Sequence, residues 1–460
     1  MLREKIGDKK FYFMVLKLTI PIMIQNGITN FVSLLDNIMV GKVGTEEMSG
    51  VAIVNQLMFI FMLCIFGAVS GAGIFTAQYF GQGNQEGVRH TFRFKLIIVL
   101  AVTAIFSCFM IWGGDWFIAR YLHEGSQEGD LVATANFAKE YLFICLFELI
   151  PFAVMQVYVS TLRESGETFV PMVAGLSAVF VNLFFNYVLI FGNFGAPKLG
   201  VEGAAIATLI SRFVELTIVV VWTHRHHERN KFIVGIYKSC YIPRKLALRI
   251  LVKGFPLLVN EGLWAAGQAV LIQCYSVRGI AIVAGMNISS TIANLFNIVF
   301  IALGSTISIV VGQQLGAGKM KEARTSAYRM TGFSVISCIG VSIIMISVGR
   351  FFPMIYNVSA EVKRIAVSII VLSACTMPMQ AYLHATYFTI RSGGKTFITF
   401  LFDSVFVWVI TIPLAYILSE YTSLPVAPMF LIVQLADSIK CIIGFFMVRS
   451  GMWQHNIVNN

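Results

Sequence analysis

Charged residues are scarce in this sequence. Asp, Glu, Lys and Arg make up 12% of its 460 residues, whereas hydrophobic residues make up 57%. Soluble domains carry roughly 25% charged residues. The mean hydropathy is +0.79. This composition excludes an ordinary soluble domain and predicts a polytopic membrane protein.

Cysteine patterns that would indicate a disulfide framework are missing as well. The eight cysteines form no CxxC motif and no dense cluster, and most lie in apolar runs. We therefore predict that they are small core residues. A signal peptide is not indicated, because the basic start MLREKIGDKK leads directly into a long apolar segment without a small-residue cleavage site.

The sequence also lacks a catalytic constellation in its hydrophobic segments. It contains no HExxH motif, and His384 is the one histidine deep in such a segment. A membrane-embedded enzyme would need more than a single imidazole, so we expect no enzymatic activity. The run HRHHE at 224–228 lies in a basic loop and is not expected to bind metal.

Long hydrophobic segments are abundant. A membrane helix needs about 20 mostly apolar residues. The sequence contains twelve such segments, at 14–41, 50–78, 94–113, 138–161, 169–192, 203–222, 249–277, 280–314, 328–349, 366–390, 397–419 and 425–448. Most of the 34 Lys and Arg lie in the N-terminal segment and in every second loop. The positive-inside rule therefore predicts that both termini are cytoplasmic, in a plasma (inner) membrane. This topology accounts for the net charge of +11, so no nucleic-acid partner is expected.

An internal repeat divides the chain into two halves. The first copy and its counterparts 235 positions later include Pro21 and Pro256, Gln25-Asn26-Gly27 and Asn260-Glu261-Gly262, Gln78 and Gln313, and Gly81 and Gly316. Further along, the offset is 228, as for Arg163 and Arg391 or Arg212 and Lys440. Because six helices return the chain to its starting side, the repeat predicts two six-helix bundles in parallel orientation. We predict lobes at 1–222 and 249–460, joined by a cytoplasmic linker at 223–248. Repeated bundles that rock about a central site are the physical basis of alternating access.

The ordered motifs resemble the MATE (multidrug and toxic compound extrusion) family of cation-coupled exporters. The first half contains LDNIMVGKVG, GAVSGAGIFTAQYFGQGN, VNLFFNYVLIFG and GVEGAAIATLISR, and the second contains IALGSTISIVVGQQLGAGKMKEAR. The resemblance implies an all-α transporter with two six-helix lobes in a V, whose central cavity opens alternately to either side. It also implies export of amphipathic, cationic small molecules in exchange for Na+ or H+, without a cofactor. We expect a monomer in contact with small-molecule substrate and membrane lipid.

The resemblance implies a cation site in the N-terminal lobe. Asp36 matches the coupling acid of the first helix, and Asn182, Asn186 and Thr208 match polar positions that complete the site. Some relatives have a second acid where this chain has Asn186, which leaves Na+ and H+ both open. No metal other than Na+ at Asp36 is expected.

The residues themselves are compatible with this site. A charge such as that of Asp36 at membrane depth costs at least about 2.5 kcal/mol and usually faces a protein interior or a watery cavity. The alternative is an interfacial residue that pairs with water or Lys42. Asn182 and Asn186 are four residues apart, so their amides share one helix face, and amide, hydroxyl and carboxylate oxygens form a hard-cation site. The alternative for the two amides is interhelical hydrogen bonding.

A second acidic centre is expected in the C-terminal lobe. The resemblance makes Glu261 and Asp403 the counterparts of acids that some relatives use there. Glu261, Trp264 and Gln268 fall on one helix face, and a carboxylate beside an aromatic ring suits an organic cation. The alternative is a structural hydrogen bond to the facing helix.

The remaining acids in predicted helices have mostly structural interpretations. Asp437 with Lys440, and Glu215 with Arg212, have i,i+3 spacing and are predicted to form ion pairs. Glu148 precedes Pro151, so a local polar contact and a role in transport both remain open.

The hypothesis is a secondary active transporter in which Asp36 alternates between a neutralised and a charged state. Burial disfavours the charged form of a carboxylate. Neutralisation would then allow the first helix to bend near Pro21 or Gly27 and shrink the cavity. One rival is a lipid-linked oligosaccharide flippase of the same superfamily, which would favour cationic cavity residues and helices beyond twelve. The other is the membrane-embedded enzyme considered above.

Overall fold

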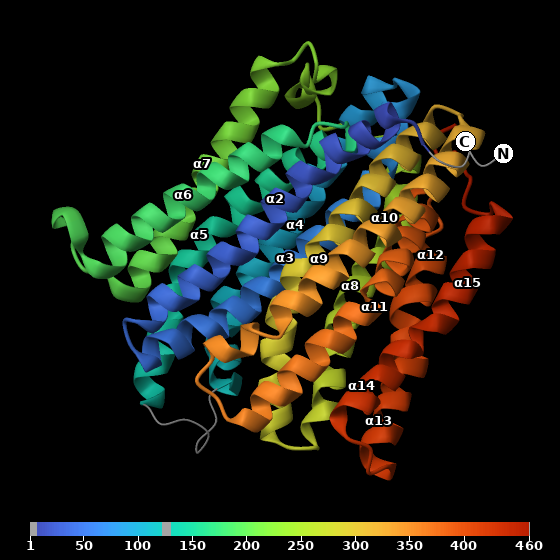
Figure 1. Ribbon diagram of the computed structural model, residues 1–460. Coiled ribbons are helices and arrows are strands. Elements are labelled where there is room, and N and C mark those ends of the chain that lie inside the picture. The colour runs from blue at the N-terminus through green and yellow to red at the C-terminus, as the bar shows by residue number, and fades with distance from the viewer. Residues whose placement is uncertain (1–6, 122–129, 460) are drawn as a thin grey trace. The chain divides into compact units, whose positions relative to one another are not determined.

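The computed structural model describes residues 7–121 and 130–459 (Figure 1), and every regular element within these ranges is a helix. The first half contains α2 (Lys9–Gly41), α3 (Thr45–Gln82), α4 (Gln85–Tyr121), α5 (Leu131–Glu164), α6 (Phe169–Phe191) and α7 (Gly200–Arg225). The second half contains α8 (Arg244–Ser276), α9 (Ile280–Gly316), α10 (Met320–Gly349) and α11 (Ala360–Ser392), followed by two interrupted spans.

The interrupted spans are each built from several shorter elements. The first consists of α12 (Thr396–Phe400), the π-helical segments η5 (Leu401–Val405) and η6 (Val407–Thr411), and α13 (Ile412–Tyr421); the second consists of α14 (Val426–Leu435) and α15 (Asp437–Ser450). Counted this way, the described chain has twelve long helical spans, and the predicted all-α membrane architecture is confirmed. Eleven of the described helices are long and apolar enough to cross a membrane. The remaining one, α8, begins with a basic stretch at Arg244–Lys253 and holds Asn260 and Glu261.

Most helices extend beyond the predicted hydrophobic segments. Hydropathy detects only the part of a helix that crosses hydrocarbon. The helical backbone hydrogen bonds continue beyond that part until a residue such as glycine ends the helix. The predicted segments 138–161 and 366–390 therefore ended too early. The structure places Arg163 and Arg391 inside α5 and α11, and not in loops as predicted. A glycine with positive φ follows each helix end, Gly166 at 86° and Gly394 at 74°.

Two compact units are distinguished by their internal contacts. The N-terminal unit comprises Ile24–Thr76 and Gln85–Ile250, and the C-terminal unit comprises Met1–Met23, Ala77–Asn84 and Leu251–Asn460. Helices α2 and α3 thus each contribute a segment to both units. The predicted division into lobes at 1–222 and 249–460 stays a prediction.

In the N-terminal unit, α7 packs against α5 and α6 (Figure 1). The chain after α7 forms two short 3-10 helices, η2 (Lys231–Ile233) and η3 (Ile236–Lys238). Two arginines of α4 hold this segment: Arg89 Nε donates to Phe232 O at 3.2 Å, and Arg93 Nε donates to Ile236 O at 2.8 Å. The basic linker is therefore a structured part of the N-terminal unit.

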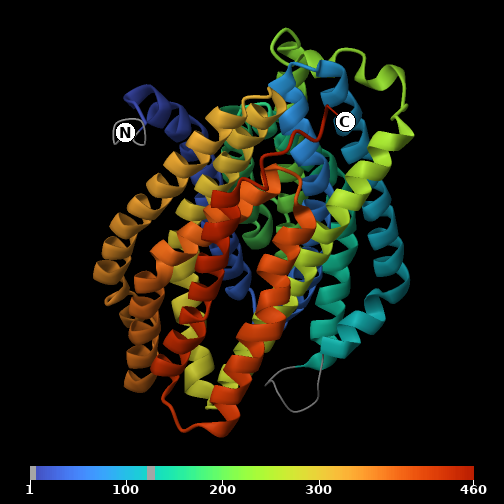
Figure 2. The ribbon, with the colours of Figure 1, turned by 90° about the vertical axis from the view of Figure 1, so that its right-hand side faces the viewer.

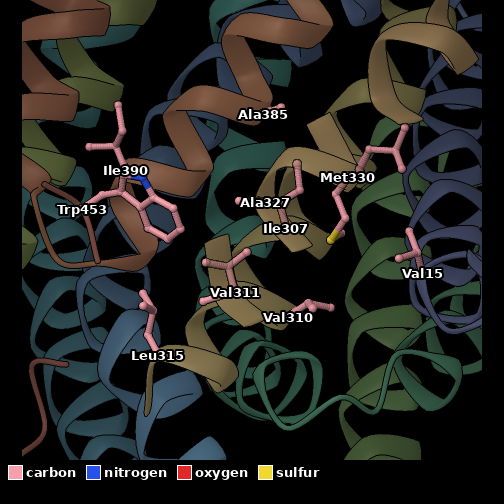
Figure 3. Packing of buried hydrophobic residues seen from close by; sticks show 12 residues of the cluster. Val15, Ile307, Val310, Val311, Leu315, Ala327, Met330, Ala385, Ile390 and Trp453 are labelled. Atoms are coloured by element: carbon pink, nitrogen blue, oxygen red, sulfur yellow. The ribbon is translucent and has the colours of Figure 1, made fainter. Parts of the chain in front are cut away.

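The core of the C-terminal unit lies among α9, α10 and α11, with contributions from α2 and the C-terminal tail (Figure 3). Its labelled members are Val15, Ile307, Val310, Val311, Leu315, Ala327, Met330, Ala385, Ile390 and Trp453. Trp453 is 0% exposed, and its indole Nε1 donates to Val448 O at 3.1 Å. A buried indole with a satisfied N–H anchors the residues that follow α15.

The C-terminal tail is also held by the last turns of α3 (Figure 2). Gln78 is 0% exposed; its Nε2 donates to Ser392 O at 2.9 Å and to His455 O at 3.2 Å, and its Oε1 accepts from Ile457 N at 2.8 Å. The nitrogen and the oxygen of this buried amide are therefore both hydrogen-bonded, as is usual for a buried polar side chain.

Two glycines allow α3 and α9 to approach closely at the same place. A Cβ on Gly81 would lie 1.9 Å from Gln313 O, and a Cβ on Gly316 would lie 1.9 Å from Gln78 O. These residues are counterparts in the repeat, so the crossing is symmetric. Only glycine, which has no side chain, permits it.

Candidate functional site

The four residues predicted for the cation site are joined in one hydrogen-bonded array. Asn186 Nδ2 donates to Asp36 Oδ1 at 2.6 Å and to Asn182 Oδ1 at 3.1 Å. Asn182 Nδ2 donates to Thr208 Oγ1 at 3.2 Å, and the Thr208 hydroxyl donates to Ala204 O at 3.1 Å. Helices α2, α6 and α7 each supply part of the array. The predicted common face of Asn182 and Asn186 is confirmed.

One oxygen of this array has no partner. Asn186 and Asn182 are 1% and 4% exposed. The Oδ1 of Asn186 is buried and accepts no hydrogen bond from any described residue. An unpaired buried acceptor costs about 1–3 kcal/mol, and amide and carboxylate oxygens are ligands for hard cations. The donor set therefore fits a bound Na+ at Asp36 and Asn186, with a proton on Asp36 as the alternative.

Positive charge is close to this array. Arg212 NH1 pairs with Glu215 Oε2 at 3.1 Å, which confirms the predicted i,i+3 ion pair. Arg212 also interacts electrostatically with Asp36 and Glu148. In contrast, no ion pair joins Asp36 to Lys42 in the part of the chain that the structure describes. An arginine of α7 thus contributes positive charge near Asp36, whose direct partner is the amide of Asn186.

Glu148 is a further acid of the N-terminal unit and lies in α5. It follows Tyr141 and Cys145 at helical spacing on α5, and its Oε2 is buried without a hydrogen-bond partner among the described residues. A local polar contact near Pro151, one of its two predicted interpretations, is therefore not formed by this oxygen.

In the C-terminal unit, Asp403 is held by α8. Asn260 Nδ2 donates to Asp403 Oδ2 at 3.0 Å, while Ser404 Oγ contacts Asn260 O at 2.9 Å and Asn260 Oδ1 at 2.7 Å. Asp403 lies in the π-helical segment η5, upstream of Pro413. The wide turns of a π-helix occur frequently at functional sites.

Glu261 lies next to this contact but is not part of it. No hydrogen bond among the described residues joins Glu261 to Trp264, Gln268 or Asp403. Trp264 is 41% exposed and Glu261 is half-buried. Glu261 interacts electrostatically with Asp403 and with Arg391. The two predicted acids therefore influence each other, and Gln268 forms no hydrogen bond with either of them among the described residues.

Two buried cations and one half-buried cation were not among the predicted functional residues. Arg391 is 7% exposed, Lys95 is 0% exposed, and Arg163 is half-buried and donates to Gln25 Oε1. The interior is thus less dominated by acids than the sequence indicated. The internal repeat could have indicated Arg163 and Arg391, because they are counterparts at offset 228.

The remaining predicted residues have clear positions. Pro21 and Gly27 lie within α2, which is one continuous helix, so bending there stays a prediction. The ion pair of Asp437 with Lys440 is confirmed at 2.9 Å. In the HRHHE run, His224 Nε2 lies 3.2 Å from Tyr158 Oη and the His226 ring stacks on Trp222.

Comparison with known proteins identifies a family and individual proteins to which this chain is similar. The sequence model of the MatE family matches residues 21–188 and 256–417, which is most of the chain. A protein of Thermotoga maritima named "Probable multidrug resistance protein NorM" is 24% identical over 450 residues, covering 96% of this chain and 93% of that protein. "Probable multidrug resistance protein YoeA" of Bacillus subtilis is 25% identical over 415 residues, covering 88% and 87%.

Solved structures have the same fold. One described as "Crystal structure of MATE in complex with MaL6" has a TM-score of 0.85 at 19% identity, covering 97% of both chains. Another, described as the outward-facing conformation of a multidrug resistance MATE family transporter of the MOP superfamily, has a TM-score of 0.85 at 18% identity with the same coverage.

Proposed function

The chain belongs to the MatE family of multi-pass membrane proteins, and from this premise we propose that it exports amphipathic, cationic small molecules by alternating access in exchange for Na+ or H+. Two of its relatives carry the names of probable multidrug resistance proteins, and a solved structure with the same fold is described as a MATE family transporter. We infer a plasma-membrane location with both termini cytoplasmic, and a monomeric unit that works without a cofactor.

The observation that carries the proposal is the array at Asp36. A carboxylate in a membrane helix is hydrogen-bonded to the buried amide of Asn186 at 2.6 Å, and the oxygen of that amide has no partner. A structural hydrogen-bond network would be expected to satisfy its buried acceptors. The free acceptor beside a carboxylate favours a site that receives a cation.

In the proposed cycle, Asp36 is neutralised by a cation or a proton from the outside. Neutralisation removes its attraction to Arg212 and reduces the cost of its charge at membrane depth. The α2 helix then bends near Pro21 or Gly27, which displaces substrate. Release of the cation to the cytoplasm restores the charge and the hydrogen bond with Asn186. Glu261 and Asp403 attract the cationic substrate, with Trp264 and Gln268 beside Glu261.

The test uses purified protein in sealed liposomes loaded with a fluorescent cationic dye, under either a Na+ gradient or a pH gradient. We expect dye export under one gradient and loss of gradient-driven export in Asp36→Asn. The matched control is Asp115→Asn, which removes the same charge from a side chain that is 78% exposed and should leave export intact. Full gradient-driven export by Asp36→Asn would refute the role of this residue. Absence of dye movement under both gradients, with folded protein, would refute cation-coupled drug export.

A further inference from the structure

The basic linker that follows α7 is held in place by α4. Besides the bond from its Nε to Ile236 O, Arg93 donates from NH2 to Gly235 O at 3.1 Å. Phe232 and Ile236 are 1% and 2% exposed, and the centre of the Phe232 ring lies 5.9 Å from that of the Phe92 ring. Because both the backbone and these buried side chains are held, the other side chains of the linker form a defined outer surface.

Apolar and aromatic side chains are exposed on this surface. Val234, Tyr237 and Tyr241 are 52%, 63% and 66% exposed. The hydroxyl groups of Tyr237 and Tyr158 are hydrogen-bonded to each other, and the Tyr237 ring stacks on His224 with ring centres 5.8 Å apart. The polar end of Tyr237 is therefore turned inward while much of its ring is left exposed. This orientation suits a ring that contacts hydrocarbon on its outer side.

Part of the linker surface is hollowed. The hollow has a volume of about 500 Å³, and its apolar walls include Ile233, Val234 and Ile236. Tyr237 and the exposed side chain of Lys238 also line it. An apolar hollow with an ammonium group beside it fits a molecule in which an anionic group adjoins hydrocarbon.

Positive charge dominates the linker and the helix ends that flank it. The segment 225–245 contains six exposed cationic residues: Arg225, Arg229, Lys231, Lys238, Arg244 and Lys245. None of the six forms an ion pair with a residue that the structure describes. Glu228 is the one acid in the segment, so six positive charges and one negative charge leave an excess of five. The charge of this surface is therefore complementary to an anionic partner.

The position of the linker in the chain favours lipid over a soluble partner. Helix α7 ends at Arg225 and α8 begins at Arg244, so the linker lies close to the surface of the membrane that α7 crosses. Trp222, in the last turn of α7, stacks on His226 with ring centres 4.6 Å apart. Tryptophan and tyrosine concentrate at the interface between membrane and water, and Lys and Arg at its cytoplasmic side. Lysine, in contrast, is depleted in interfaces between proteins.

We propose that the linker is a binding site for an anionic phospholipid of the cytoplasmic leaflet. Lys238 receives the phosphate group, and the hollow lined by Val234 and Tyr237 receives the hydrocarbon next to it. The anionic lipids of this leaflet attract Lys and Arg that lie near the membrane surface. The proposal goes beyond the export function and shares with it only the cytoplasmic orientation of the linker.

The test measures lipid binding to the purified full-length protein in detergent by native mass spectrometry. The probes are dioleoylphosphatidylglycerol, which is anionic, and dioleoylphosphatidylcholine, which has the same chains and no net charge. We expect the first phosphatidylglycerol molecule to bind at least about fivefold more tightly than phosphatidylcholine. Lys238→Gln should weaken phosphatidylglycerol binding by about fivefold, since it removes one positive charge from the site. Val234→Asn should weaken binding of both lipids by about threefold, since it makes one wall of the hollow polar.

Two matched variants separate this site from a general effect of charge or hydrophobicity. Lys321→Gln removes an exposed lysine of α10, which the sequence also predicts to be near the cytoplasmic surface. Val277→Asn changes a valine that is 58% exposed and lies outside the linker. Both should leave lipid binding unchanged. Glycerol 3-phosphate, which has the phosphate group without the acyl chains, should not compete with the lipid at equal concentration.

Several results would refute the proposal. They are equal affinities for the two lipids, equal losses in Lys238→Gln and Lys321→Gln, or unchanged binding in both Lys238→Gln and Val234→Asn. Competition by glycerol 3-phosphate as strong as that of the lipid would assign the hollow to a soluble phosphate ester instead. None of these measurements depends on transport, so failure of the proposed export function leaves them valid.

The orientation of the linker is tested separately through Cys240, an exposed cysteine of this segment. A membrane-impermeant maleimide should label it in sealed inside-out vesicles, and Cys240→Ser should abolish that labelling. Labelling in right-side-out vesicles alone would overturn the assignment of the site to the cytoplasmic leaflet.

Discussion

Lys95 and Glu164 form an ion pair in the interior of the N-terminal unit. The Lys95 side chain is 0% exposed, and its Nζ also donates to Ser160 Oγ at 3.1 Å and Thr161 Oγ1 at 3.2 Å. Gly73 leaves room for the carboxylate, because a Cβ there would lie 2.2 Å from Glu164 Oε1. The pair therefore depends on three helices, α3, α4 and α5.

Removing one partner of this pair should be strongly destabilising. We expect Lys95→Met to lower the free energy of unfolding by about 3–5 kcal/mol, because the carboxylate of Glu164 would lose its buried cationic partner. Lys95→Met combined with Glu164→Gln should recover part of the loss. Thermal unfolding in detergent, followed by labelling of the buried cysteines Cys145 and Cys338, measures the change.

The control for this prediction is the exposed pair of Lys139 with Asp115, at 3.0 Å and with side chains 49% and 78% exposed. Lys139→Met should cost no more than about 1 kcal/mol, because water screens this pair. Equal losses in Lys95→Met and Lys139→Met would contradict a structural role for the buried pair.

The symmetric glycine crossing should tolerate no side chain. Gly81→Ala and Gly316→Ala would each place a methyl group 1.9 Å from a backbone oxygen of the other helix. We expect each variant to lose about 1–3 kcal/mol of stability through overpacking. Gly332→Ala is the control, because no atom lies within 4 Å of its Cβ, and it should be neutral or stabilising by up to about 1 kcal/mol. If the three variants had the same stability within error, the close approach of α3 and α9 would be absent in solution.

The hold of Gln78 on the C-terminal tail predicts local protection from proteolysis. Two of its three hydrogen bonds reach the tail, at His455 O and Ile457 N, and each is worth about 0.5–1.5 kcal/mol, so Gln78→Ala should raise the rate of tail cleavage near His455 by at least about fivefold. A C-terminal epitope and limited proteolysis measure this rate. Gln82→Ala, which removes an exposed contact to Asn459, should have a much smaller effect. Similar cleavage rates in both variants would mean that Gln78 does not retain the tail.

The unpaired oxygen of Asn186 predicts an effect on the affinity for the coupling cation. Asn186→Ala should raise the cation concentration for half-maximal export by about tenfold, corresponding to about 1.4 kcal/mol, because it removes both the free acceptor and the donor to Asp36. Ser177→Ala on the same helix is the control, since its hydroxyl contacts only Val173 O. An unchanged half-maximal concentration in Asn186→Ala, with normal folding, would exclude this amide from the site.

Local sequence patterns predicted those features that depend on a single helix. The 20-residue apolar runs identified the spans, because the hydrocarbon thickness sets the length of a crossing helix. The i,i+4 spacing placed Asn182 and Asn186 on one face, and the i,i+3 spacing paired Arg212 with Glu215. Helix ends were less accurate, since the charged side chains of Arg163 and Arg391 lower the local hydropathy although both residues lie within helices.

These local patterns could not predict contacts between helices. The sequence placed Glu261, Trp264 and Gln268 on one face of α8, whereas Asp403 is bonded to Asn260, the residue before Glu261. Rotation and axial register decide which side chains of two helices meet, and a one-residue difference in register changes the facing partner by about 100° around the axis.

The sequence alone therefore determined that this is an all-helical membrane protein with a duplicated architecture, a buried acid in its first helix and an arginine retained in each half. These features follow from composition, periodicity and the offset between repeats. The tertiary structure decided which groups are paired and which are not: the oxygen of Asn186 without a partner among the described residues, the burial of Lys95 beside Glu164, and the burial of Arg391. Such properties arise from the relative placement of helices that are distant in the chain, and no local pattern encodes that placement.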